Sequence, residues 1–122
     1  MIVMKFGGSS VANASRMRQV AELVLAARER TPCVVLSAMG KTTDALFAAA
    51  NAALGGDLRE ALQRIDGVFA TAASATDELL AAPAATHERL QTMRSDVETL
   101  LRGVKLLREL TPRTRDAIVA HG

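Results

Sequence analysis

The chain has 122 residues, enough for one compact domain, and 49% of them are hydrophobic although only 2% are aromatic. Lys and Arg number 15 against 13 Asp and Glu, so the net charge of +2 excludes the basic stripe typical of nucleic-acid binders. No apolar run approaches the ~20 residues of a membrane span, and the first residues lack the pattern of a secretory signal. The single cysteine, Cys33, cannot form an internal disulfide. These features favour a reduced, cytoplasmic protein with no nucleic-acid or membrane partner.

The first forty residues predict a strand, a helix and a second strand. The apolar runs at 1–6 (MIVMKF) and 33–36 (CVVL) are typical of buried strands, and each leads into a polar loop with glycine. Between them apolar residues recur at helical spacing, with Asn13 or Ser15 as the N-cap and Pro32 as the stop. Two strands joined by a helix form a βαβ unit with parallel strands. Both loops should therefore lie at the carboxyl end of the sheet, where ligands bind in open α/β sheets.

The remainder of the chain has a wholly helical pattern. It predicts one helix that stops at Gly55 and Gly56, two long helices that fold back as a hairpin, and a short final helix. The expected helix starts are Thr43 or Asp44, a capping box of Asp57 with Glu60, a start near Thr86, and Thr111 followed by Pro112. A parallel sheet of two strands is a poor independent domain, so we expect residues 1–122 to be the first part of a larger α/β domain.

The second loop, SAMGKTTD at 37–44, contains the Gly-Lys-Thr of a nucleotide-binding P-loop. That motif needs another glycine at position 35, where this chain has the β-branched Val35 inside a strand, so we reject it. Two interpretations stay open. Hydroxyls and free amides of the loop can bind a small carboxylate at a helix N-terminus, or Ser37 merely ends the strand while Thr43 caps the helix.

The first loop, Lys-Phe-Gly-Gly-Ser-Ser at 5–10, has the parts of a phosphate site. Gly7 and Gly8 let backbone amides approach an anion, Ser9 adds a hydroxyl, and Lys5 adds a positive charge. The alternative is an ordinary Gly-Gly turn with Lys5 in solvent. Lys5 is the only charge in its apolar run, and because an unpaired buried ammonium is costly, we expect a partner anion. No His, Cys or acidic cluster has metal-ligand spacing, and no nucleophile and base can be paired.

Three segments in order resemble the start of an aspartokinase of the amino-acid kinase family, of the lysine-sensitive monofunctional type: VMKFGGSSVANASRM, VVLSAMGKTTDAL and LLRGVKLLRELTPRTRDAIVAHG. The resemblance covers essentially the whole chain. It implies a three-layer α/β/α fold, of which this chain holds two parallel strands followed by a helical hairpin. It also implies transfer of the γ-phosphoryl group of Mg-ATP to the side-chain carboxylate of L-aspartate. The product is 4-phospho-L-aspartate, on the way to lysine, threonine and methionine, in the cytoplasm or in a plant or algal plastid.

The resemblance also implies roles for individual residues. Lys5 would be catalytic and bind the phosphoryl group of ATP, with Gly7, Gly8 and Ser9 lining its path. Aspartate would be bound by Ser37, Ala38, Met39, Gly40 and Thr43. Residues 1–122 would be the N-terminal portion of the catalytic domain, without the nucleotide-binding half and the regulatory ACT domains.

The missing parts define what we expect of the chain by itself. It should be an incomplete catalytic domain, with most contacts to ATP and Mg²⁺ made by other residues, and the full-length protein should be a homo-oligomer. The competing hypotheses are an autonomous helical dimerisation module and another small-molecule kinase of the same superfamily.

Overall fold

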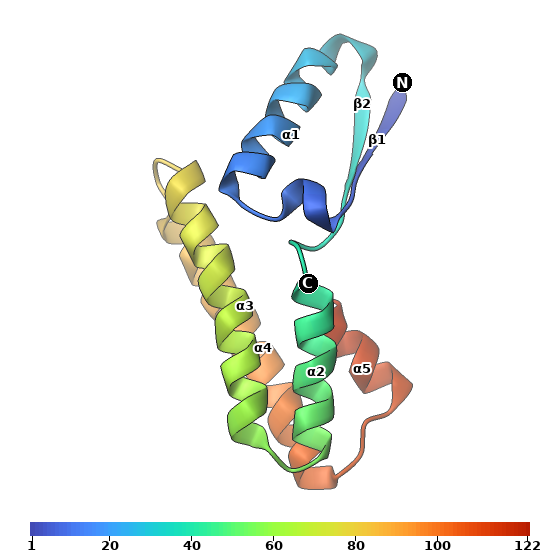
Figure 1. Ribbon diagram of the computed structural model, residues 1–122, viewed down its shortest axis with the longest axis vertical. Helices are drawn as coiled ribbons and strands as arrows, with labels where there is room; N and C mark the ends of the chain where they lie inside the picture. Colours follow the sequence, from blue (N-terminus) through green and yellow to red (C-terminus); the bar gives the residue numbers. More distant parts are fainter. The chain divides into compact units, whose positions relative to one another are not determined.

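The computed structural model describes residues 1–122 as two units, Met1–Lys41 and Thr42–Gly122 (Figure 1). The first unit consists of strand β1 (Ile2–Phe6), the short 3₁₀ helix η1 (Gly8–Val11), helix α1 (Ala14–Ala26), the 3₁₀ turn η2 (Arg28–Arg30) and strand β2 (Pro32–Leu36). The two strands pair in parallel, from Ile2 opposite Pro32 to Phe6 opposite Leu36. The predicted pair of parallel strands joined by a helix is confirmed.

Local capping chemistry sets the start of α1. The side chain of Asn13 accepts a hydrogen bond from the Arg16 N–H at 2.9 Å, so Asn13 is the N-cap and Ser15 lies inside the helix. The helix ends at Ala26, well before the predicted stop at Pro32, which instead opens β2. Between them Thr31 adopts a left-handed conformation with φ 52°. This is a rare backbone for a β-branched residue.

The sheet is less buried than the sequence predicts. Along β1 the side chains alternate, with Ile2, Met4 and Phe6 half-buried and Val3 67% exposed. Along β2 the residues after Pro32 are exposed, and Val35 is 44% exposed. The expectation of buried strands is therefore not met within these 122 residues. A parallel strand is buried on both faces only when both are covered, and within this unit the only long helix beside the strands is α1 (Figure 1).

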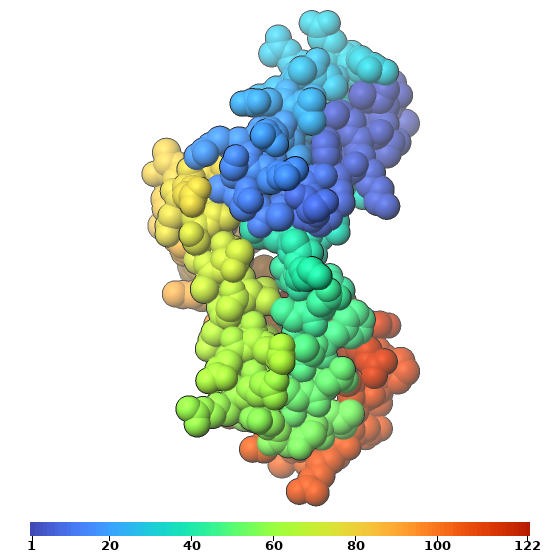
Figure 2. All heavy atoms as spheres, in the orientation of Figure 1, coloured from blue at the N-terminus to red at the C-terminus, as the bar shows by residue number.

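The second unit contains only helices: α2 (Thr42–Leu54), α3 (Leu58–Leu79), α4 (Ala84–Leu107) and α5 (Pro112–Val119). Helices α3 and α4 pack against each other as the predicted hairpin, and α2 packs along both. Near the turn that joins α2 to α3, the side chains of these two helices are in contact without a gap (Figure 2). The core is made of small and branched aliphatic side chains and one aromatic ring, namely Leu46, Ala49, Ala50, Ala53, Ala61, Ile65, Phe69, Val97, Leu101, Val104 and Ile118. None of the helices is long and apolar enough to cross a membrane.

The helix starts follow the predicted caps with small shifts. Asp57 accepts from the Glu60 N–H at 2.9 Å, but the Glu60 carboxylate bonds Arg64 at 2.7 Å, so only half of the expected capping box forms. The other half is lost because the Asp57 N–H already donates to the Ala52 carbonyl at 2.9 Å. Thr111 caps α5 as predicted, accepting from the Thr114 N–H at 3.1 Å. The remaining starts lie slightly earlier than predicted, with α2 beginning at Thr42 and α4 at Ala84.

A network of charges joins α3 to α4. Arg94 donates to Asp66 on α3 at 2.7 Å and to Glu98 on its own helix at 2.6 Å. Glu98 also accepts from Arg102 at 2.6 Å. Hydrogen bonds from Arg102 and then Arg94 lower the pKa of Glu98, because they favour its charged form. One bond of this network, from Arg94 to Asp66, therefore links the two helices of the hairpin on their solvent side.

Replacing Thr31 by glycine should stabilise the first unit. The left-handed backbone at φ 52° suits glycine, and relief of strain should exceed the entropy that glycine loses, for a net gain of about 1 kcal/mol. The measurement is urea unfolding followed through the amide signals of β2. Thr99→Gly is the contrast, since it places glycine inside α4 and should cost about 0.3 kcal/mol instead of giving a gain. A destabilised Thr31→Gly protein would contradict the strain argument.

Candidate active site

The ends of β1 and β2 bring the two glycine-bearing loops side by side. Beyond the last strand pair, the Ser37 N–H donates to the Phe6 carbonyl at 3.0 Å, and the Gly40 N–H donates to the Gly8 carbonyl at 3.0 Å. Both bonds lie within the first unit, and they continue the contact between the two strands past their ends. We call residues 7–9 and 37–40 together the loop pair. The expectation that both loops lie at the carboxyl end of the sheet is confirmed.

Close packing inside the loop pair explains one of its glycines. A Cβ atom on Gly8 would lie 2.9 Å from the Gly40 carbonyl oxygen and 3.1 Å from that of Ala38. Both contacts are to backbone, which cannot rotate away as a side chain would. Gly40 itself has φ +49°, a conformation that glycine adopts at little cost. Gly7 differs, because a Cβ there would have nothing within 4 Å. Packing requires glycine at position 8 and leaves position 7 free.

Lys5 lies on the open face of the sheet, two residues before the first loop. It pairs in register with Val35, and its side chain is exposed without a hydrogen bond or ion pair. The inference that Lys5 is a buried ammonium is therefore wrong, for the same reason that the strands are not fully buried. The cation is nevertheless unpaired and next to the loop pair, so it is available to an external anion.

Several polar groups of the loops are also unused by the fold. Ser9 and Ser37 are exposed, and neither hydroxyl has a hydrogen-bond partner. Gly8 and Ser9 open η1, and the first amides of a helix have no partner within it. Ala38 and Met39 are half-buried, and they contribute backbone at the edge of the second loop. Amides, hydroxyls and a free cation together suit an anionic ligand.

Two features of this region were not predicted. The first is η1, held by the Ser10 N–H donating to the Gly7 carbonyl at 3.0 Å and by burial of Val11. The sequence signal for it is that Val11 and Ala14 are apolar and three residues apart, and in the structure both are buried. The second is Lys41, an exposed cation beside Gly40 to which the sequence reasoning gave no role. Thr43, the last predicted aspartate ligand, lies in the first turn of α2, within the second unit.

The loop pair does not offer a site for Mg²⁺. Nowhere do three His, Cys, Asp or Glu side chains come together in a way that could hold a metal ion. Mg²⁺ in proteins is usually held by one or two carboxylates together with substrate phosphates, and residues 7–9 and 37–40 contain amides and hydroxyls but no carboxylate. Any metal that accompanies the ligand must take its protein ligands from other residues.

Comparison with known families decides the class of protein. The model of the amino acid kinase family matches residues 1–122. The chain belongs to this family. Aspartokinase 1, chloroplastic, from Arabidopsis thaliana is 40% identical over 122 residues, covering 98% of this chain and 21% of that protein. The aspartokinase of Mycobacterium tuberculosis is 51% identical over 49 residues, covering 38% of this chain and 12% of that protein.

A solved structure supports the fold. Escherichia coli aspartokinase III in complex with aspartate and ADP matches with a TM-score of 0.79 and 28% identity, over 100% of this chain and 26% of that one. The two-stranded parallel sheet with its helices therefore has the α/β fold of the amino acid kinases, as predicted. The Arabidopsis relatives match this chain along nearly its whole length, and the chain spans about a fifth of theirs. This is in keeping with an incomplete catalytic domain.

Gly8→Ala should disrupt the loop pair, and Gly7→Ala should not. The added methyl at position 8 forces the Gly40 and Ala38 carbonyls away, at a cost of about 1–3 kcal/mol. At position 7 the change should stay within about 0.5 kcal/mol because the methyl meets open space. Urea unfolding gives the stabilities, and loss of protection of the Gly40 amide from hydrogen exchange reports on the bond to Gly8. Equal effects of the two variants would refute the packing argument.

Proposed function

We propose that this chain supplies part of the active site of an aspartokinase, which transfers the γ-phosphoryl group of ATP to the side-chain carboxylate of L-aspartate. The observation that carries the proposal is the loop pair itself, which sets hydroxyls and amides beside an unpaired Lys5. Support comes from the similarity in sequence and fold to aspartokinase III, solved with aspartate and ADP. Phosphoryl transfer requires mainly positioning and charge stabilisation, which such groups provide.

The proposed roles divide between the two loops. Lys5 neutralises charge on the phosphoryl group during transfer, and the backbone of Gly7, Gly8 and Ser9 lines its path. The second loop holds aspartate through Ser37 and Thr43, with the backbone of residues 38–40 beside it. The aspartate carboxylate is itself the nucleophile, so no general base is needed to generate it. The lack of a base in the loop pair is compatible with this reaction.

Other parts of the reaction belong to residues outside these 122. We propose that the adenine and Mg²⁺ of the ATP complex are bound there, because the loop pair has no carboxylate for the metal. We further propose that the product, 4-phospho-L-aspartate, enters lysine, threonine and methionine biosynthesis, and that the full-length protein is a homo-oligomer. The curated Arabidopsis relatives are named as chloroplastic. For this protein we propose the cytoplasm, or the plastid if its source is a plant or alga.

Lys5→Ala should act on the rate of the chemical step. In a full-length enzyme that contains this chain, loss of a charge directed at the transferring group should lower kcat on the order of 10²-fold or more. Steady-state kinetics of ATP-dependent aspartyl hydroxamate formation measure the effect. Arg113→Ala, which removes an exposed and unpaired cation from α5, is the matched control and should leave kcat unchanged. A near-normal kcat in Lys5→Ala would refute the assignment.

Ser37→Ala should act instead on the binding of aspartate. The hydroxyl is used in the ground state and the transition state alike, so its loss should raise the KM for aspartate, with roughly 1–3 kcal/mol of binding lost and kcat little changed. Varying each substrate in turn separates the two KM values. Ser74→Ala, at an exposed position on α3, is the neutral control. An increase in the KM for ATP alone would reverse the assignment of the two loops.

A further inference from the structure

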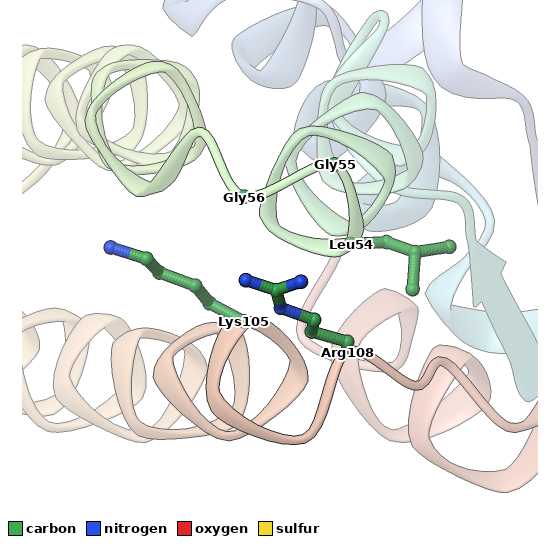
Figure 3. A pocket seen from close by; sticks show the side chains of 5 residues that line it. All are labelled: Leu54, Gly55, Gly56, Lys105 and Arg108. Atoms are coloured by element: carbon green, nitrogen blue, oxygen red, sulfur yellow. The ribbon is translucent and has the colours of Figure 1, made fainter.

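A polar hollow lies in the helical unit, and none of the residues that line it belongs to the loop pair. It has a volume of about 270 Å³ and is formed by the turn after α2 and the last turn of α4 (Figure 3). Its lining consists of Leu54, Gly55, Gly56, Lys105 and Arg108. In Figure 3 the Arg108 side chain extends from the end of α4 towards the glycine turn, while the Lys105 side chain extends sideways, to the left of the view. The proposed phosphoryl transfer gives this hollow no role.

Both cations of the hollow lack a partner. Three arginines of the helical unit are paired, since Arg64, Arg94 and Arg102 each lie 2.6 or 2.7 Å from a carboxylate oxygen, whereas those on α5, Arg113 and Arg115, are exposed and unpaired. Lys105 and Arg108 make no hydrogen bond or ion pair. The acidic residue that follows the glycine turn, Asp57, has its carboxylate bonded to the Glu60 N–H at 2.9 Å. Two positive charges therefore face one hollow with no negative charge assigned to them.

The backbone at Arg108 gives a second reason to look for a ligand. Arg108 follows α4 as its C-cap with φ 53° and ψ 38°, a left-handed conformation that favours glycine. A few per cent of non-glycine residues have positive φ, and their strain is often found at functional sites. The fold would be served at least as well by glycine here. Backbone preference therefore does not account for arginine at this position.

We propose that this hollow is a binding site for a small phosphate-type dianion. Lys105 provides a point charge, and the Arg108 guanidinium provides a planar set of donors that matches phosphate oxygens. The turn keeps the opposite wall open, since a Cβ on Gly56 would meet nothing within 4 Å. A volume of about 270 Å³ is below the ~300–1,000 Å³ of pockets for drug-sized ligands, so it suits inorganic phosphate or a small phosphomonoester rather than a nucleotide.

The test is an NMR titration of the ¹⁵N-labelled protein with inorganic phosphate, with ionic strength held constant by sodium chloride. Saturating shifts are expected at the Gly55 and Gly56 amides, with a dissociation constant of about a millimolar, as two charge-assisted contacts allow. A parallel titration with glycerol 3-phosphate distinguishes the two sources. Tighter binding of the ester identifies a phosphomonoester as the ligand, and tighter binding of the free ion identifies phosphate.

Two double variants make the test decisive. Lys105→Gln with Arg108→Gly should weaken binding at least about tenfold. The same protein should keep or raise its Tm, because glycine suits the backbone at position 108. Arg113→Gln with Arg115→Gln removes the same charge from exposed positions of α5 and should leave the dissociation constant unchanged. Three results would overturn the proposal. They are an equal loss of phosphate affinity in both double variants, no saturation of the shifts at Gly55 and Gly56, and shifts confined to Gly7 and Gly8. The last result would leave the proposed aspartokinase function intact.

Discussion

The backbone contact between Gly8 and Gly40 is the constraint on which the candidate site depends. The Gly40 N–H bonds the Gly8 carbonyl at 3.0 Å, and the missing Cβ of Gly8 lets the Gly40 and Ala38 carbonyls come this close. Because backbone alone makes this contact, the side chains of both loops stay free for a ligand. The hydroxyls of Ser9 and Ser37 accordingly have no partner within the protein. Preorganised donors of this kind act without reorganising when charge develops on a substrate.

Much of the fold could be predicted because its signals are local. Asn13, Asp57 and Thr111 each cap a helix through a side chain that accepts from an amide three residues later, and such caps can be read from a few letters. Glycine and proline mark the ends of elements in the same way, as at Gly56, where φ is +90°. The contact between the two loops followed from topology, since parallel strands bring their carboxyl ends together. Resemblance to a family then supplied what topology cannot, which is the identity of the ligands that we propose.

The errors concern properties that depend on distant residues. The capping box at Asp57 and Glu60 fits the local pattern, yet the Asp57 N–H bonds the Ala52 carbonyl from the preceding helix, and Glu60 turns to Arg64. Burial of a strand likewise depends on what covers each face of the sheet, which an apolar run cannot specify. The left-handed backbone conformations of Thr31 and Arg108 could not be predicted from the sequence, for another reason. Neither residue type prefers this conformation, so propensity argues against them.

Lys5 was singled out because it was expected to be buried, but its position in the structure gives a different reason to expect a role in binding an anion. Its isolation among apolar residues suggested a buried ammonium in need of an anion, but the side chain is exposed beside Val35 on the open face of the sheet. Exposure removes the desolvation cost, so nothing in the folded chain compels a partner. What singles Lys5 out is position, two residues before a loop whose amides and hydroxyls are unused. An exposed cation makes only a weak contact in water, and its charge becomes effective when a bound substrate excludes solvent from the same place. The role proposed for Lys5 therefore depends on residues that close over the loop pair as much as on Lys5 itself.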